Sequence, residues 1–204
     1  RNIYDKLVQE LPDGTVEPRL AASWEFVDDL TVRFKLRDDV KFHNGEPFTA
    51  EDVLFSIERG LKNPISASTF KYFDVKNSKI IDPHTIDIKL VMPYAPIFNT
   101  LSSGRGSIVS KKTVEEMGDN KAARNPVGTG PYKLKNWVSG TEIVLEKNES
   151  YWGKKAITPN VIFKVIPEAA NRVIELETGG ADIIYDVAGT DVERVNDIEG
   201  AHIL

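Results

Sequence analysis

The alternation of apolar and polar residues predicts several β-strands. Residues 30–37, LTVRFKLR, alternate with a period of two, which is typical of a strand with one buried face. Residues 78–91 contain two such runs, separated by the turn sequence Asp82-Pro83-His84-Thr85. In this turn proline presets a backbone angle and aspartate can bond its own backbone. Residues 132–147 predict a further hairpin around Ser139-Gly140.

Apolar residues at helical spacing predict two helices in the first third of the chain. Residues 2–10 have this spacing, and the turn sequence Pro12-Asp13-Gly14 follows them. A second helix is expected to begin after Thr49, whose hydroxyl can cap a free amide, and to stop at Asn63-Pro64. Its expected apolar stripe consists of Val53, Leu54, Ile57 and Leu61.

The last third of the chain has the pattern of an α/β unit. A strand over 160–166 leads through Pro167 into a helix over 168–180, and a second strand is expected over 181–187. Such strand–helix–strand units are typically parallel and right-handed. Because hairpins dominate the earlier residues, the predicted fold class is mixed α/β (α+β), with a boundary near Lys111.

The composition excludes several classes of function. The 204 residues carry a net charge of -5, which argues against a nucleic-acid partner, because phosphates require a basic surface. No apolar run approaches the roughly 20 residues that span a bilayer. The absence of cysteine excludes thiol catalysis, disulfides and thiolate metal sites, and we expect no cofactor and no metal. The histidines His43, His84 and His202 are widely separated and are interpreted as solvated turn residues.

A glycine-rich stretch at residues 125–137, NPVGTGPYKLKNW, suggests either a phosphate-binding loop or a turn. A phosphate-binding loop requires its glycines to lead into a helix, whose free amides face the anion. Gly128 and Gly130 instead lead into Pro131 and an alternating run. We therefore interpret them as structural. They supply backbone angles that other residues resist, or they allow another segment to approach closely.

Catalysis has little support in the residues. Paired carboxylates occur at 28–29, 38–39, 51–52 and 115–116, but adjacent residues on a strand point to opposite faces, whereas a hydrolase needs two acids that face each other. Single tryptophans such as Trp24, Trp137 and Trp152 are more often structural anchors than ligand platforms. Arg105 stands between two glycines in SSGRGS; it is either a solvated loop residue or a fork presented to a carboxylate.

Four stretches occur in an order and at intervals that together are specific. They are residues 13–59, which begin DGTVEPRLAASW and end AEDVLFSIER, residues 125–137, residues 145–153 (LEKNESYWG) and residues 175–183 (ELETGGADI). Together they resemble the peptide/nickel-type extracellular solute-binding proteins, family 5, of ATP-driven importers. The resemblance extends over nearly the whole chain.

The resemblance implies a periplasmic-binding-protein-like type II clamshell, of which this chain is a part. Residues 1–110 match the family's small extra subdomain, and residues 111–204 match part of the first lobe. The second lobe and the C-terminal return are expected to be absent, and the opening on Arg1 indicates a processed or trimmed piece.

The implied function is that of the substrate-binding component of an ABC importer. It would capture dipeptides or oligopeptides and deliver them to membrane permease subunits, in the periplasm or, as a lipoprotein, on the outer face of the cell membrane. The alternatives are a nickel-chelate, haem or oligosaccharide cargo, a ligand-presenting sensor module and, with less support, a hydrolase.

The resemblance also implies a ligand site and a structural turn. Phe70 and Tyr72 match an aromatic position over the ligand, and Ser103, Gly104 and Arg105 match a loop that lines the pocket. Arg105 would meet a carboxylate of a peptide or chelator. Gly128, Gly130 and Pro131 match a turn that leads the chain back into the first lobe, and we expect that Gly130 cannot accept a side chain.

Overall fold

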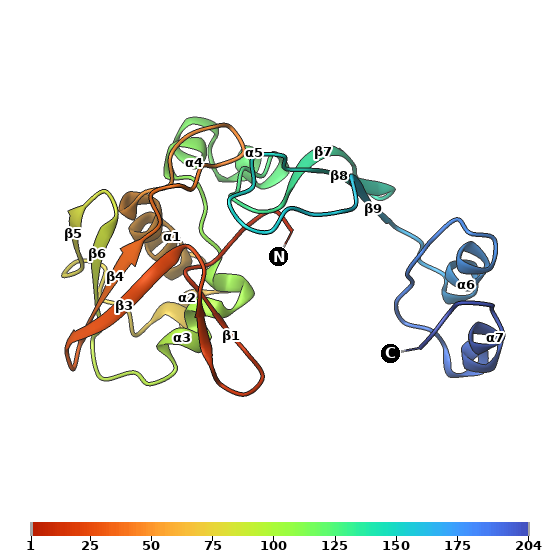
Figure 1. The fold of residues 1–204 in the computed structure, drawn as a ribbon, viewed down its shortest axis with the longest axis horizontal. Helices are drawn as coiled ribbons and strands as arrows, with labels where there is room; N and C mark the ends of the chain where they lie inside the picture. The colour runs from red at the N-terminus through yellow and green to blue at the C-terminus, as the bar shows by residue number, and fades with distance from the viewer. Residues whose placement is uncertain (1, 204) are drawn as a thin grey trace. The chain divides into compact units, whose positions relative to one another are not determined.

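The computed structural model describes residues 2–203, which form two compact units (Figure 1). The first unit extends to Lys135 and includes Leu145–Val161, and the second consists of Asn136–Val144 and the residues from Ile162 on. The predicted division between residues 1–110 and 111–204 concerns the lobes of the family, and it stays a prediction.

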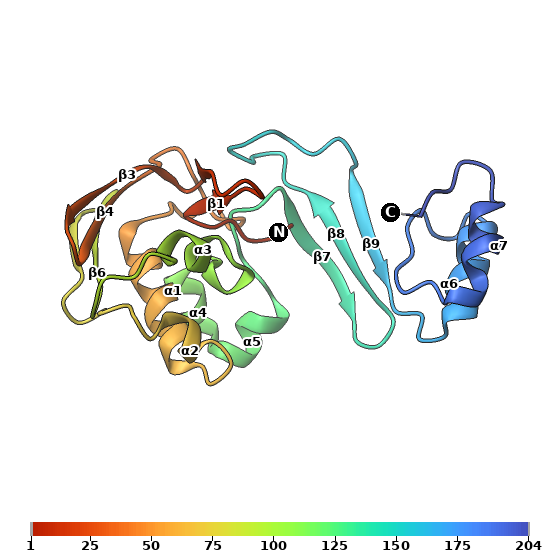
Figure 2. The same ribbon diagram turned by 90° about the horizontal axis from the view of Figure 1, so that it is seen from below.

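An antiparallel four-stranded sheet is the centre of the first unit. Its order is β3 (Ala21–Asp28), β4 (Thr31–Leu36), β6 (Thr85–Lys89) and β5 (Lys79–Asp82). The strands predicted over 30–37 and 78–91 are therefore confirmed. The helices of this unit lie on one side of the sheet (Figure 2). Phe34 and Ile86 of the sheet and Ile57 of the helical layer belong to one buried apolar cluster.

The predicted helix after Thr49 is confirmed as α1 (Ala50–Lys62). The Thr49 amide donates to the Asp52 carboxylate over 2.9 Å, and the second oxygen of that carboxylate accepts from the Lys111 amide over 2.9 Å. Asp52 thus satisfies free amides at the starts of two helices. The other helical segments of the unit are α2 (Ala67–Phe70), α3 (Ile97–Ser102), the 3₁₀ turn η1 (Gly104–Gly106), α4 (Lys111–Met117) and α5 (Asp119–Arg124).

The helix predicted over residues 2–10 is wrong. These residues are extended, and β1 (Val8–Glu10) pairs with β2 (Val16–Pro18) across a turn in which Gly14 has a φ of 83°. In a helix the backbone carbonyls of this segment would accept hydrogen bonds from amides four residues later. Here they accept from residues far along the sequence. The Ile3 carbonyl accepts from the Gly130 amide, and the Asp5 carbonyl accepts from the Ile108 amide. Contacts more than 100 residues away therefore determine the conformation of this segment.

A three-stranded sheet has the order β7 (Tyr132–Val138), β8 (Glu142–Lys147) and β9 (Asn160–Lys164). The predicted hairpin around Ser139-Gly140 is confirmed, and Gly140 has the left-handed φ of 76° that this turn requires. The helical segments of the second unit are α6 (Ala169–Glu177), η2 (Gly189–Asp191) and α7 (Val192–Asn196). Helix α6 begins two residues after Pro167, so the proline precedes the helix.

The second strand predicted over 181–187 is not formed. Asp186 has a φ of 55°, which interrupts an extended backbone. The Arg172 guanidinium donates to the carbonyls of Tyr185 and Asp186, at 3.0 Å each, so these acceptors are already used. Tyr185 is 75% exposed. The parallel strand–helix–strand unit is therefore absent from residues 2–203.

Candidate functional site

The loop Gly128–Pro131, called the glycine loop below, packs against the N-terminal segment. The Gly130 amide donates to the Ile3 carbonyl over 2.9 Å, and the Tyr132 amide donates to the Asn2 carbonyl over 2.9 Å. A Cβ on Gly130 would lie 2.6 Å from the Asn2 carbonyl oxygen, and one on Gly128 would overlap the Ile3 carbonyl oxygen. Neither glycine has a left-handed φ. Close approach of another segment therefore explains both glycines.

His43 is held by the glycine loop. Its Nε2 lies 3.0 Å from the Gly130 carbonyl oxygen, and its Nδ1 accepts from the Gly128 amide over 3.3 Å. A neutral imidazole protonated on Nε2 satisfies both bonds. The interpretation of His43 as a solvated turn residue is therefore wrong, whereas His202 is exposed. His84 is half-buried, and its Nδ1 is buried without a hydrogen-bond partner among the described residues.

The burial of His43 makes stability depend on pH. Burial lowers the pKa of His43 below its ordinary value of 6.5. The unfolded chain therefore takes up a proton at a higher pH than the folded chain, so stability is fully present above pH 6.5 and declines as the pH falls through that value. We expect the free energy of unfolding in urea to fall less between pH 7.5 and 5.5 in His43→Gln than in the wild type. The exposed His202→Gln is the control, and an equal fall in all three proteins would contradict the prediction.

Asp5 joins the glycine loop to the stretch at 145–153. One carboxylate oxygen accepts from the Thr129 hydroxyl and from the Trp152 indole N–H, at 3.0 Å each, and the other accepts from the Tyr151 hydroxyl over 3.3 Å. Burial, together with the Asp5 charge and this hydrogen bond, raises the pKa of Tyr151 to about 12. Tyr151 is therefore a neutral donor at physiological pH. Trp152 is a structural anchor, as expected for a single tryptophan.

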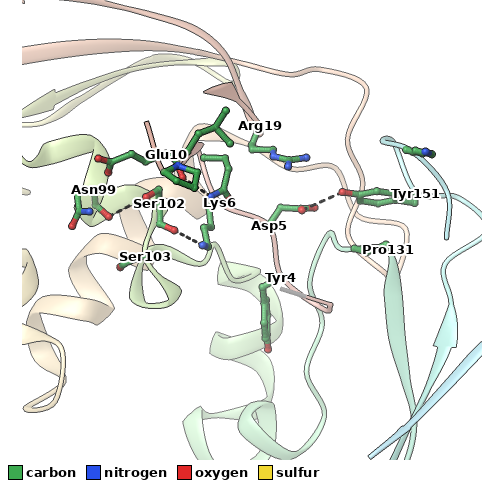
Figure 3. A pocket seen from close by; sticks show the side chains of 14 residues that line it. Tyr4, Asp5, Lys6, Glu10, Arg19, Asn99, Ser102, Ser103, Pro131 and Tyr151 are labelled. Atoms are coloured by element: carbon green, nitrogen blue, oxygen red, sulfur yellow. Dashed lines mark hydrogen bonds between the residues drawn. The ribbon is translucent and has the colours of Figure 1, made fainter. Parts of the chain in front are cut away.

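A groove of about 880 Å³ opens beside Asp5, within the first unit (Figure 3). The N-terminal segment, the β1–β2 hairpin and the end of α3 form its walls together with the 151–154 stretch. Lys6 is buried, and its ammonium donates to the Ser102 carbonyl at the end of α3, which fixes two of these walls together. The lining residues are Tyr4, Asp5, Lys6, Gln9, Glu10, Leu11, Pro12, Arg19, Asn99, Ser102, Ser103, Pro131, Tyr151 and Lys154.

Two of the segments predicted to face a ligand lie together. Ser103 lines the groove. The neighbouring Arg105 is exposed, and its guanidinium donates to the Thr69 hydroxyl over 3.2 Å. Gly104 is exposed as well, with open space where a Cβ would stand. The loop at 103–105 is therefore next to the α2 segment, which also contains Phe70.

The two predicted aromatic contacts are less accessible. Phe70 is only 2% exposed, and its ring packs against Gly60 and lies 5.5 Å from the Phe73 ring. Tyr72 is half-buried and stacks on Tyr94 with ring centroids 4.4 Å apart. Their contact with a ligand stays a prediction, and for Phe70 it would require the ring to leave the core.

Several groove residues carried no signal in the sequence. Glu10, Arg19 and Lys154 are single charged residues in or near turns, and such residues are usually solvated. Tyr151 lies in the 145–153 landmark, but the pattern gave it no role. Residues 2–203 contain no cluster of three or more histidine, aspartate or glutamate side chains that could hold a metal. Nor does any helix in this range have the length and apolar character to cross a membrane.

Known proteins resemble this chain over nearly its whole length. The "Probable D,D-dipeptide-binding periplasmic protein DdpA" of Escherichia coli (strain K12) is 38% identical over 192 residues, which are 88% of this chain and 37% of that protein. The structure of the DppA periplasmic binding protein of Helicobacter pylori in complex with the peptide STSA is 33% identical, with a TM-score of 0.83. The structure of NikA from Brucella suis in complex with Fe(III)-EDTA is also 33% identical to this chain, with a TM-score of 0.83.

The structural matches cover 97% of this chain, but only 43% of the Helicobacter protein and 41% of the Brucella protein. The chain thus spans about two fifths of the length of the relatives it matches. The predicted type II binding-protein fold, present in part, is confirmed by these likenesses. The model of the bacterial extracellular solute-binding proteins, family 5 (Middle), matches residues 15–203, so the chain belongs to this family.

Proposed function

We propose that this chain contributes one side of the ligand site of an ABC-importer binding protein that captures short peptides. The observation that carries the proposal is the family match over residues 15–203. The peptide named with the Helicobacter structure supports this cargo, and the chelate named with the Brucella structure supports a metal chelate as the second candidate. A family of transport binding proteins favours capture over turnover of the solute.

Capture would use the groove and the adjoining loop at 103–105 as a polar wall. Such a wall offers hydroxyls, amides and charges to the main chain of a peptide, and water can complete the contacts. Closure of the protein over the solute would then depend on contacts that exist only in the closed state. Delivery to membrane permease subunits, on the outer side of the cell membrane, follows from the same proposal.

Native mass spectrometry can test the proposed cargo. The longest polypeptide that the gene encodes is purified from its host without denaturation and is examined for a retained small molecule. We expect a mass increment that fragments as a peptide of a few residues. An increment that contains a transition metal would favour the chelate, and turnover of the retained molecule on incubation would contradict a binding function.

Arg105 provides a residue-level test of the site. Its exposed guanidinium can form a bidentate pair with a carboxylate, and hydrogen bonds to charged groups contribute about 1.5–3 kcal/mol. We therefore expect Arg105→Ala to weaken binding of the retained solute at least tenfold in calorimetry. Lys76→Ala, which removes an exposed cation outside the groove, is the control. Unchanged affinity in Arg105→Ala would remove Arg105 from the site.

A further inference from the structure

His43 is joined to the glycine loop by three hydrogen bonds, two of which use its ring. The His43 amide donates to the Gly128 carbonyl over 2.8 Å, the ring Nδ1 accepts from the Gly128 amide, and the ring Nε2 donates to the Gly130 carbonyl. Gly128, Thr129 and Gly130 are buried, so solvent does not take the place of these partners. Only the neutral imidazole can provide one acceptor and one donor, so the contact requires an uncharged His43.

Protonation changes the ring from one donor and one acceptor into two donors. The Nδ1–H of an imidazolium would face the Gly128 amide, which is itself a donor, so this hydrogen bond cannot persist. A buried amide without an acceptor and a buried charge without a partner are both costly. The charged ring is therefore compatible with the glycine loop only when the loop has moved away from it.

Two charged groups on neighbouring segments act on the ring in opposite directions. Asp5, on the N-terminal segment, favours the imidazolium, and Lys133, on β7, opposes it. The Asp5 carboxylate already accepts hydrogen bonds from three other side chains. Burial has the largest effect and lowers the pKa of His43 below 6.5. The folded protein therefore resists the proton until the solution is distinctly acidic.

The glycine loop also holds one wall of the groove. Its Gly130 amide donates to the Ile3 carbonyl over 2.9 Å, and the Thr129 hydroxyl donates to the Asp5 carboxylate over 3.0 Å. Asp5 lines the groove, and so does Pro131 at the end of the loop (Figure 3). A loop that moves away from the imidazole therefore displaces groove-lining residues of the loop and of the N-terminal segment.

We propose that the contact of His43 with the glycine loop is an acid-sensitive device: a proton on the imidazole releases the loop and the groove wall that it holds, and a solute in the groove keeps the loop closed. The second half rests on the proposed capture of a solute, and the first half does not. The released ring has the ordinary histidine pKa of 6.5. Each pH unit below 6.5 therefore makes opening up to about tenfold more frequent, which amounts to about 25-fold between pH 7.0 and 5.0.

Hydrogen exchange of the loop amides tests the release without a ligand. We expect the protection factors of the Gly128 and Gly130 amides to fall about tenfold or more between pH 7.0 and 5.0. At pH 5.0 they should also lie below the limit that global unfolding in urea sets, because the loop opens while the rest of the unit stays folded. Unchanged protection, or exchange only through global unfolding at both pH values, would overturn the proposal.

His43→Gln separates the imidazole from other titrating groups. Glutamine offers one acceptor and one donor group but takes up no proton, so its loop protection should change less than about twofold between the two pH values. His84→Gln, which replaces another half-buried histidine, is the matched control and should keep the pH dependence of the wild type. If His43→Gln does not fold, the wild type and His84→Gln still decide the question: a fall in both supports the proposal, and equal protection at both pH values overturns it.

The effect of a solute is tested on the longest encoded polypeptide at pH 5.0, with tri-alanine and a nickel–histidine chelate as probes. A probe that binds only the closed loop, present at 100 times its Kd, should raise the protection of the Gly128 and Gly130 amides about hundredfold. A probe that binds without changing this protection retains capture of a solute and overturns the coupling of the loop to the groove. A protein that binds neither probe and carries no retained molecule contradicts the proposed function, whereas the acid release is decided by the exchange of the free protein.

Discussion

Gly130→Val is expected to be one of the two most destabilising single changes considered for this chain. A Cβ at this position would stand 2.6 Å from the Asn2 carbonyl oxygen and 2.6 Å from the Ile3 carbonyl carbon, and both belong to backbone. A backbone neighbour cannot rotate away as a side chain can, so the N-terminal segment must leave the glycine loop. That movement breaks the hydrogen bonds that the Gly130 and Tyr132 amides donate to the Ile3 and Asn2 carbonyls.

We expect a loss of about 3–5 kcal/mol, in the range of severe changes that disrupt packing and backbone hydrogen bonds together. For a domain of this size, this corresponds to a fall of roughly 6–20 °C in the melting temperature. Circular dichroism measures the fall. Gly104→Val is the matched control, because Gly104 has open space around its Cβ position and no left-handed φ. Equal melting of Gly130→Val and wild type would show that the loop can open without cost.

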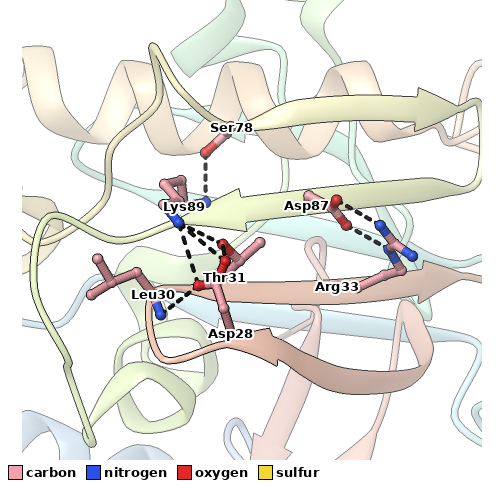
Figure 4. A network of polar contacts seen from close by, with 7 residues as sticks. All are labelled: Asp28, Leu30, Thr31, Arg33, Ser78, Asp87 and Lys89. Carbon is pink, nitrogen blue, oxygen red and sulfur yellow. Dashed lines mark hydrogen bonds and ion pairs between the residues drawn. The ribbon is translucent and has the colours of Figure 1, made fainter.

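Alternation predicted the central strands because a pleated strand places successive side chains on opposite faces. On β4 and β6, Arg33 and Asp87 are register partners and form a bidentate ion pair with N–O distances of 2.7 and 2.8 Å (Figure 4). The Arg33 hydrogen bond lowers the pKa of the Asp87 carboxyl. The neighbouring pair, Phe34 and Ile86, is fully buried. The polar pair and the apolar pair thus lie on opposite faces of the sheet, as the alternation along each strand requires. The sequence was therefore enough to predict these two strands.

The two wrong elements fail for a common physical reason. Residues 2–10 have helical spacing, but the partners of their backbone are the glycine loop and Ile108, which no local window contains. Residues 181–187 have the composition of a strand, but a strand needs a neighbour, and Arg172 binds two of the carbonyls instead. The spacing of apolar residues indicates which side chains are buried. It does not indicate which residues form hydrogen bonds with the backbone of the segment.

The candidate site was predictable only in part for the same reason. Ser103 and Arg105 were predicted through the family resemblance, and their contact with a ligand stays a prediction. The structure places Ser103 in the groove wall and Arg105 beside Thr69. The place of Glu10 in the groove was not predicted, because it depends on the pairing of β1 with β2, where the sequence indicated a helix. Asp5 and Trp152 are 147 residues apart in the sequence, and no sequence pattern predicted the hydrogen bond between them.

Asp5→Ala is expected to destabilise the protein about as much as Gly130→Val does. The Asp5 carboxylate accepts three hydrogen bonds, and its removal leaves the hydroxyl of the fully buried Thr129 and the indole N–H of Trp152 without an acceptor. Buried donors without a partner cost about 1–3 kcal/mol each. We therefore expect a loss of about 3–5 kcal/mol in urea unfolding, with a changed tryptophan emission because the surroundings of Trp152 open.

Two further variants show whether the hydrogen bonds, and not the charge of Asp5, produce this loss. Asp5→Asn has nearly the same shape but keeps only one acceptor oxygen, so it should lose an intermediate amount. Asp29→Ala removes an exposed carboxylate from the β3–β4 turn and should change stability by less than about 0.5 kcal/mol. If Asp5→Asn unfolded with the wild type, or if Asp5→Ala unfolded with Asp29→Ala, the carboxylate would not be what holds the glycine loop to the 151–152 segment. The closeness of the N-terminal segment to that loop would then depend on packing against the two glycines and on the hydrogen bonds of the Gly130 and Tyr132 amides to the Ile3 and Asn2 carbonyls.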